Sequence, residues 1–292
     1  MGPGPPRSLG DVVRIAVTGA GGGLGLAFQQ VIGTAHDVHP FTRRELDVCS
    51  YDAVMKRLVP LEVDVIMHFA AMTAVDACEE DPQRAAETNV GGSFNVAAAA
   101  RESRAALVAI STDYVFDGDQ ESPYTEDDDS NPISVYGLTK YAGEWVASGT
   151  APDLLVVRTA WVYGAGEDFF SKAVRRLKDG EEVGAIADQI GSPTHVVHLA
   201  ERLLPLVTSS IRGVVHLAGA EAVSWHDALL RAKELGGLPG EVVAQKADEL
   251  IRPARRPANS ALTSVVVGGD SSVPPMPSLE EGIRRVLRDV GA

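Results

Sequence analysis

A tyrosine and a lysine lie four residues apart at the start of a predicted helix, in the run Tyr136-Gly-Leu-Thr-Lys140. This spacing places both side chains on one face of the helix. A phenol has a pKa of about 10, and a nearby ammonium lowers that pKa by stabilising the phenolate. We therefore expect Tyr136, activated by Lys140, to act as the general acid that reduction of a carbonyl requires.

Two hydroxyl side chains, Ser111 and Thr112, end the apolar segment that precedes this helix. In an open α/β sheet, ligands bind outside the carboxyl ends of the strands. A hydroxyl at this point can hydrogen-bond a substrate carbonyl beside the tyrosine. Thr112 is therefore the third candidate catalytic residue.

A glycine-rich turn, Thr18-Gly-Ala-Gly-Gly-Gly-Leu-Gly25, follows an apolar segment and opens a helical one. Glycines in such a turn let the backbone approach a pyrophosphate, and the N–H groups of the helix start point at the phosphates. The spacing here is G-x-x-G-x-x-G, whereas the dinucleotide fingerprint is G-x-G-x-x-G. We expect cofactor contacts from Gly19, Gly22, Gly23, Leu24 and Gly25.

Two arginines, Arg43 and Arg44, follow the second predicted strand, where a site for NAD usually has an acidic residue. A guanidinium suits a ribose 2′-phosphate through its charge and its paired hydrogen bonds. The sequence therefore favours NADPH as cofactor and leaves NADH as an alternative. Asp47 and Val48 are expected near the adenine.

Apolar strands alternate with helical segments over the first 160 residues. Strands are predicted over 12–18, 36–41, 63–69, 106–111 and 154–159, and helices over 24–32, 50–58, 81–103 and 134–148. This alternation predicts an α/β fold with a Rossmann-type, doubly wound parallel sheet.

The pattern becomes irregular after residue 160, which predicts a smaller C-terminal substrate-binding lobe. The predicted division is a disordered tail over 1–10, a dinucleotide-binding domain over 11–160 with returning elements at about 195–220, and the lobe over 161–194 and 221–292.

Composition excludes several classes of protein. A net charge of −14 argues against a nucleic-acid partner. No apolar run approaches the roughly 20 residues of a membrane helix, and the first ten residues have no apolar signal region. The two cysteines fit a reducing compartment, so a cytoplasmic chain is expected. The seven histidines show no metal-ligand spacing, and no metal is predicted.

Several motifs together resemble those of the dTDP-4-dehydrorhamnose reductases, the 4-ketoreductases of deoxysugar pathways. The similarity covers nearly all of residues 13–290, and the motifs that carry it are the glycine turn, Phe69-Ala-Ala-Met-Thr-Ala-Val-Asp76, Ser111-Thr-Asp-Tyr-Val-Phe-Asp-Gly118, Pro123-Tyr-Thr-Glu126, Tyr136-Gly-Leu-Thr-Lys-Tyr-Ala-Gly-Glu144, Arg158-Thr-Ala-Trp-Val-Tyr-Gly164, Asp188-Gln-Ile-Gly-Ser-Pro-Thr194 and Arg256-Pro-Ala-Asn-Ser260.

The resemblance implies a role for individual residues. It implies that Thr112, Tyr136 and Lys140 are the catalytic set, and that Tyr136 and Lys140 also meet the cofactor. Further cofactor-proximal positions are Ala70, Ala71 and Asn89. The implied substrate contacts are Thr73, Tyr114, Trp161, Gln189 and Arg256. The substrate would be a nucleotide-linked 4-keto-6-deoxy sugar, reduced at C4.

Two departures from the family pattern leave the identity of the sugar open. Thr263 stands where the family usually has an aspartate, and Ser278 lies in the segment where it often has a tryptophan before the last helix. Both positions fall in the predicted substrate lobe. The resemblance also leaves a homodimer open.

Three other functions compete with reduction. The related sugar-nucleotide 4,6-dehydratases carry Thr-Asp-Glu after the fourth strand, whereas here Asp113 is followed by Tyr114, which disfavours dehydration. Epimerisation at C4 also uses a tyrosine and a lysine and remains open. The third reading is a non-catalytic regulatory protein, similar to the β subunit of eukaryotic methionine adenosyltransferase. The complete catalytic set argues against it.

Overall fold

The central sheet has six parallel strands in the order β2-β1-β3-β4-β5-β9. The computed structural model describes residues 12–267 and 273–292. The strands are β1 (Arg14–Thr18), β2 (Asp37–Phe41), β3 (Val65–His68), β4 (Ala106–Thr112), β5 (Leu154–Thr159) and β9 (Gly213–His216). The predicted α/β class and doubly wound sheet are confirmed, and the tail predicted over 1–10 lies outside the described residues.

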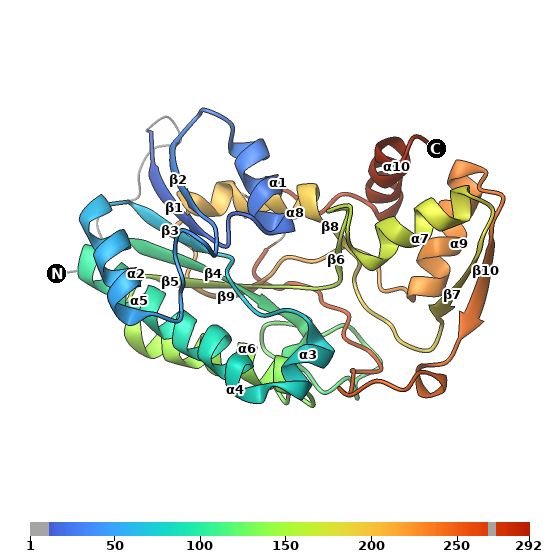
Figure 1. Ribbon diagram of the computed structural model, residues 1–292, viewed down its shortest axis with the longest axis horizontal. Coiled ribbons are helices and arrows are strands. Elements are labelled where there is room, and N and C mark those ends of the chain that lie inside the picture. The colour runs from blue at the N-terminus through green and yellow to red at the C-terminus, as the bar shows by residue number, and fades with distance from the viewer. Residues whose placement is uncertain (1–11, 268–272) are drawn as a thin grey trace.

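Helices cover both faces of this sheet (Figure 1). On one face, α1 (Gly23–Ile32) packs beside α8 (Val196–Leu203), and Phe28, Leu199 and Leu203 are buried there. The other face carries α2 (Tyr51–Leu58), α5 (Gly92–Ser103) and α6 (Val135–Thr150). The inner strands β1, β3, β4 and β5 are therefore buried on both sides, which explains their continuous apolar runs.

The order of the strands reverses at β1. The chain passes from β1 to β2 on one side and then returns to β3 on the other. Such a reversal leaves a crevice at the carboxyl ends of the strands, where open α/β sheets bind their ligands. The glycine turn at residues 19–25 lies at this point.

A separate group of elements lies at the other end of the molecule (Figure 1). Its two-stranded parallel sheet pairs β7 (Glu182–Ile186) with β10 (Glu241–Gln245). The helices α7 (Phe169–Lys178), α9 (Trp225–Gly236) and α10 (Leu279–Asp289) bury their apolar faces against each other. A short parallel pair, β6 (Val162–Tyr163) with β8 (Thr194–His195), lies near the start of α8.

One predicted helix differs in detail. The segment predicted as a single helix over 81–103 forms α4 (Pro82–Ala86), a π-helical turn (Glu87–Gly91) and α5, after a short α3 (Val75–Glu80). A π turn inserts an extra residue into the helix, which rotates the following face and often marks a functional site. No helix of the described residues is long and apolar enough to cross a membrane.

Candidate active site

A pocket of about 920 Å³ opens at the carboxyl ends of the central strands and extends to the β7–β10 sheet. Most of the predicted site residues line it. They are Gly19, Gly22, Gly23, Leu24, Gly25, Ala71, Thr73, Thr112, Tyr114, Tyr136, Trp161, Gln189 and Arg256. The predicted cofactor and substrate residues thus meet in one cavity.

The glycine turn fits a dinucleotide. Gly19 has a φ of 70°, and a Cβ there would lie 2.5 Å from the backbone nitrogen of Ala70, so only glycine allows this close approach of the turn to the residues after β3. Helix α1 has no side-chain cap at Gly22 and no acidic residue in its first turn. Its first N–H groups therefore remain available for phosphate oxygens.

Two hydroxyl groups at the floor of this pocket lack partners. The side-chain oxygens of Ser111 on β4 and Thr159 on β5 are buried, and neither has a hydrogen-bond partner among the described residues. Both residues line the pocket. Buried hydroxyl groups normally form hydrogen bonds. These two hydroxyls are therefore suited to hydrogen-bond polar groups of a bound ligand.

Helix α6 brings Tyr136 to Thr112. Ser134 caps this helix by accepting a hydrogen bond from the Gly137 N–H, which fixes where the helix begins. A Cβ on Gly137 would lie 2.0 Å from the carbonyl oxygen of Tyr114, so the helix start packs directly on the turn after β4. The rings of Tyr136 and Tyr114 meet edge to face with centroids 5.7 Å apart.

The protonation of Tyr136 differs from the expectation. Burial raises the pKa of its phenol, and a hydrogen bond with the Thr112 side chain opposes the rise. Lys140 is not among the groups that shift this pKa, and its ammonium donates to the Ile110 carbonyl oxygen at 2.7 Å. The expected lowering of the Tyr136 pKa by Lys140 is therefore not seen. The phenol keeps its proton at neutral pH, as a general acid must.

Lys140 itself lies behind the pocket lining and is buried. Desolvation lowers the pKa of its ammonium to about 8, and the charge of Glu144 opposes this change. Glu144 also forms a buried two-point ion pair with Arg158, with N···O distances of 3.1 and 2.8 Å. This pair joins α6 to β5 and so holds the helix that carries both Tyr136 and Lys140.

Asn89 lies in the π turn, behind the pocket wall. Its side-chain oxygen accepts from the Met72 N–H at 2.8 Å, and its amide donates to the Met72 carbonyl and to Thr139, each at 3.1 Å. These bonds tie the loop after β3 to α6. Asn89 is therefore placed to hold the walls of the cofactor site, and a direct cofactor contact stays a prediction.

The arginines predicted to select NADPH lie at the rim of the site. Arg43 and Arg44 are exposed in the turn after β2 and do not line the pocket. Their neighbour Thr42 reaches within 3.3 Å of where a Cβ on Gly21 would lie, which places the arginines beside the glycine turn. Asp47 and Val48 follow, and the Val48 carbonyl accepts from Asn95 at 2.9 Å.

Aromatic side chains line the part of the pocket where substrate contacts were predicted. Trp161 stacks on Trp225 with ring centroids 4.8 Å apart, and Phe169 meets Trp225 at 5.7 Å. Trp161 adopts a φ of 45°, unusual for a residue with a side chain. Gly191 makes room for its ring, since a Cβ there would lie 2.2 Å from it. Aromatic faces of this kind suit the apolar side of a sugar or a base.

Arg256 is held by an acidic partner. It makes a two-point ion pair with Asp76, with N···O distances of 2.9 and 2.7 Å, and it lowers the pKa of that carboxyl through these bonds. Arg252 also lines the pocket, and no ion pair with another described residue engages it. Of the two arginines, Arg252 has the more available charge for a diphosphate.

Some pocket residues could not be inferred from sequence spacing. Trp225, Phe169 and Gln245 come from elements far along the chain that only the fold brings to the pocket. Asp113 stands beside Thr112 in a motif that was already noted, yet its role depends on a partner 147 residues away. Nothing in the spacing of residues could have shown that contact.

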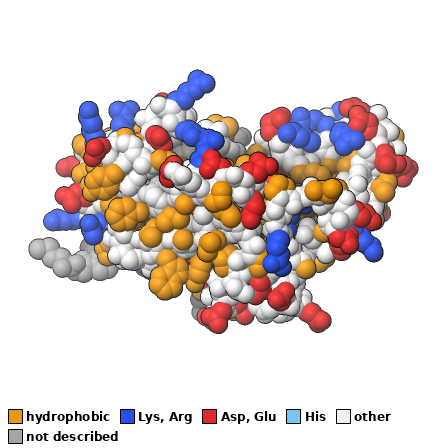
Figure 2. Space-filling view, turned by 60° about the horizontal axis from the view of Figure 1, so that its bottom comes forward, with side chains coloured by type: hydrophobic (Ala, Val, Ile, Leu, Met, Phe, Trp, Pro, Cys, Tyr) orange, Lys and Arg blue, Asp and Glu red, His pale blue; other side chains and the backbone are white. Residues whose placement is uncertain are grey.

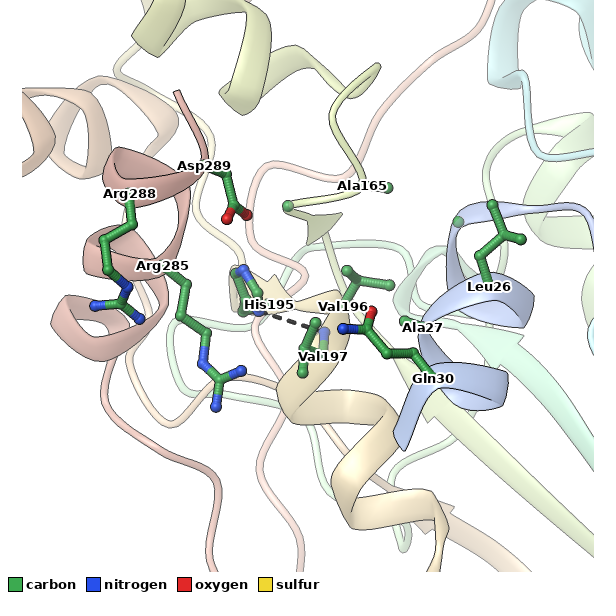
Figure 3. Close-up of a pocket in the computed structure, with 12 residues that line it drawn as sticks. Leu26, Ala27, Gln30, Ala165, His195, Val196, Val197, Arg285, Arg288 and Asp289 are labelled. Atoms are coloured by element: carbon green, nitrogen blue, oxygen red, sulfur yellow. Dashed lines mark hydrogen bonds between the residues drawn. The ribbon is translucent and has the colours of Figure 1, made fainter. Parts of the chain in front are cut away.

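A second pocket of about 340 Å³ lies between α1, α8 and α10 (Figure 3). Of its two arginines, Arg285 and Arg288, the first is paired with Glu201 at 3.1 Å, and Asp289 also lines the pocket. Of the predicted site residues only Gly23 reaches it. We therefore place the reaction in the larger pocket. Within the described residues, no group of His, Cys, Asp or Glu side chains has the arrangement of a metal site.

The sheet, the glycine turn and the Tyr-x-x-x-Lys helix at one strand edge define a dinucleotide-dependent enzyme of the extended short-chain dehydrogenase/reductase class. The family model described as the RmlD substrate binding domain matches residues 13–291. The chain belongs to that family.

Named relatives are similar over most of their length. The dTDP-4-dehydrorhamnose reductase of Mycolicibacterium smegmatis is 40% identical over 258 residues, 86% of this chain and 78% of that protein. The dTDP-4-keto-6-deoxy-D-glucose reductase of Streptomyces niveus is 37% identical, with 85% and 88% covered. The crystal structure of dTDP-4-dehydrorhamnose reductase from Bacillus anthracis in complex with NADP has a TM-score of 0.91, with 33% identity and coverage of 96% of this chain and 100% of that one.

Proposed function

We propose that this chain is an NADPH-dependent reductase of the C4 keto group of a nucleotide-linked 4-keto-6-deoxy sugar. The observation that carries the proposal is the meeting of Thr112, Tyr136 and the glycine turn in one pocket, with Lys140 directly behind it. The relatives named as reductases of such sugars and the NADP-bound structure support both the reaction and the cofactor.

The cofactor site is assigned from the residues at the β1–β3 crevice. The N–H groups at the start of α1 hold the pyrophosphate, and Arg43 and Arg44 hold the 2′-phosphate at the rim. Ser111 and Thr159 supply hydroxyls at the pocket floor. When bound, NADPH supplies the hydride for the keto carbon.

The residues of the chain supply the proton and the orientation. Thr112 positions the phenol of Tyr136, and this buried phenol gives its proton to the keto oxygen. The ammonium of Lys140 holds the Ile110 carbonyl oxygen behind the pocket and so fixes α6, which carries Tyr136, against the end of β4. Trp161 and Gln189 bind the sugar side, and Arg252 with Arg256 faces the diphosphate.

Dehydration is disfavoured by the residue at position 114. The partly buried ring of Tyr114 packs against Tyr136, where a second carboxylate would be needed to remove a proton. The keto group must therefore arrive already formed. Epimerisation remains distinguishable by experiment, because it returns its hydride and consumes no NADPH.

The test is direct. We would supply the purified chain with NADPH and the product of a 4,6-dehydratase, follow absorbance, and identify the sugar by NMR. A C4 alcohol with matching NADPH consumption is expected, and a free 4-keto sugar without nucleotide should react poorly. An epimeric product without NADPH consumption would contradict the proposal, and so would no reaction with any such substrate.

We further infer that different parts of the chain bind the cofactor and the substrate. Residues 11–160 and about 195–220 form the cofactor domain, and residues 161–194 and 221–292 form the substrate lobe. Support comes from β9 joining the central sheet and from β7 pairing with β10 outside it. Cys49 and Cys78 are both free, which agrees with a reducing, cytoplasmic setting.

We also propose that the chain forms a homodimer through the outer face of α5 and α6. Hydrophobic side chains gather on this face of the molecule (Figure 2). Phe94 on α5 and Leu138 and Trp145 on α6 are 45%, 56% and 68% exposed. Contiguous apolar surface of this kind favours a protein interface.

The oligomeric state can be measured by light scattering after gel filtration. The pair of changes Leu138→Ser and Trp145→Ser should convert a dimer into a monomer. Leu230→Ser on α9, which is 41% exposed, is the matched control and should leave the dimer intact. A monomeric wild-type chain would overturn this proposal.

A further inference from the structure

Asp113 is a buried carboxyl group at the edge of the active site. It follows Thr112 directly, where β4 ends, and only 2% of it is exposed. A carboxyl in such surroundings costs stability unless hydrogen bonds hold it. Burial raises the pKa of Asp113 to about 7, while bonds from Ser260 and Thr112 oppose the rise.

Each oxygen of Asp113 is held by a different hydroxyl group. The Thr112 hydroxyl donates to Oδ1 at 3.0 Å, and the Ser260 hydroxyl donates to Oδ2 at 2.5 Å. The two donors come from the end of β4 and from the Arg256-Pro-Ala-Asn-Ser260 segment. The carboxyl therefore joins the catalytic threonine to a distant part of the chain.

The contact determines how Thr112 is oriented. A threonine hydroxyl has one proton to donate, and here that proton goes to Asp113 while the Tyr114 N–H donates to the same oxygen at 3.2 Å. With its proton and one lone pair engaged, the Thr112 hydroxyl keeps one lone pair for the pocket that it lines together with Tyr136. Asp113 thus sets which way the threonine faces the general acid.

Ser260 is itself attached to the substrate wall of the pocket. Its N–H donates to the Ile190 carbonyl at 2.8 Å, and the Ile190 N–H donates to Ala258 at 2.8 Å. Gln189, next to Ile190, lines the pocket. A continuous series of bonds therefore runs from the residue beside Gln189 through Ser260 and Asp113 to Thr112.

We propose that Asp113 is a positioning residue that couples the orientation of Thr112 to the Ser260 segment of the substrate wall. It acts through Thr112 and does not touch the reacting carbonyl. This inference rests on the proposed reductase function and adds to it a link between substrate binding and the catalytic hydroxyl.

The test is a double-mutant cycle in kcat. Asp113→Asn keeps the shape but turns one acceptor into a donor, so one of the two hydroxyls loses its acceptor. We expect kcat to fall about tenfold to hundredfold, as it does when a catalytic group is displaced. The KM for NADPH and the KM for the sugar nucleotide should each change by no more than about twofold. Ser260→Ala is the milder variant and should lower kcat less.

The coupling appears in the combined variant. Asp113→Asn with Ser260→Ala should lower kcat no further than Asp113→Asn alone, because both act on one connection. Ser192→Ala is the matched control: its hydroxyl bonds the Leu262 backbone in the same region without touching Asp113. The effect of Ser192→Ala on kcat should be small. In the combined variant with Asp113→Asn, the fold-change in kcat should equal the product of the two single fold-changes.

The outcomes separate the two proposals. An active wild-type chain whose Asp113→Asn variant keeps its kcat, or whose Asp113 and Ser260 effects multiply independently, would overturn this inference alone. A wild-type chain that turns over no keto-sugar nucleotide would overturn the proposed function and this inference together.

Discussion

At the scale of single residues, the active site depends on a buried phenol that carries its proton at neutral pH. Removing its hydroxyl in Tyr136→Phe leaves the ring in place against Tyr114. We expect kcat to fall about 10²- to 10⁴-fold, because a general acid supplies roughly that factor. NADPH affinity, measured by fluorescence titration, should change little. Near-normal turnover of this variant would mean that another group donates the proton.

The choice of cofactor is a second property of individual residues. Arg43 and Arg44 are exposed beside the glycine turn, with no ion pair to another described residue. Changing both to alanine should raise the KM for NADPH far more than that for NADH, since a charged hydrogen bond contributes about 1.5–3 kcal/mol. Steady-state kinetics with each cofactor would show this. Equal changes for both would contradict the assignment.

At the scale of elements, α6 tests whether close packing positions the site. Gly137→Ala would place a Cβ 2.0 Å from the Tyr114 carbonyl oxygen and push the helix start away from β4. We expect a lower melting temperature and a loss of kcat of at least about tenfold, because both catalytic side chains of α6 move.

The same helix offers the matched control. Gly149 also lies in α6, and a Cβ there meets no atom within 4 Å. Gly149→Ala should stabilise the helix by up to about 1 kcal/mol without changing kcat. If the two substitutions had equal effects, the close approach at Gly137 would not be what positions the catalytic residues.

The sequence predicted the elements of the central sheet because their signals are local. Apolar β-branched runs such as Leu154–Thr159 mark buried strands, and the glycine turn and Tyr136 fall at the ends of such runs. β7 and β10 were missed: Gly184 interrupts the apolar run of the first, and the second is mostly exposed. The π turn at Asn89 was hidden inside an otherwise regular helical pattern.

Among the site residues, the lining of the pocket was predicted better than its internal contacts. Tyr136 and Thr112 lie in motifs that can be recognised from the spacing of residues in the sequence. Lys140 donates a hydrogen bond to the Ile110 carbonyl, and Arg256 forms an ion pair with Asp76. Both contacts depend on the directions of side chains, which the spacing of residues in the sequence does not show.

At the scale of the whole molecule, two buried histidines predict sensitivity to acid. Desolvation lowers the pKa of His68 to about 3, with a smaller contribution from Lys140, and lowers the pKa of His195 to about 3, with a smaller contribution from His198. The unfolded chain therefore binds more protons below about pH 6.5, and stability falls as the pH decreases through that value. At pH 5, about 1.5 units lower, each histidine would cost roughly 2 kcal/mol.

Thermal melts between pH 8 and pH 5 would measure this effect. The melting temperature should be steady at the upper end and fall steeply toward pH 5. His68→Asn, which can still bond the Thr18 hydroxyl, should flatten the profile, whereas His39→Gln at a more exposed position should not. A melting temperature independent of pH would contradict the burial of neutral histidines.

The pairing of β7 with β10 also has a consequence for synthesis on the ribosome. The partner of Glu182 is Glu241, so the first strand emerges 59 residues before the second. At about 5–20 residues per second, the nascent chain waits roughly 3–12 s for this partner, and longer for α10. During that interval the apolar face of α7, with Phe170, Val174 and Leu177, is uncovered. This end of the molecule is therefore where a chaperone would bind the growing chain.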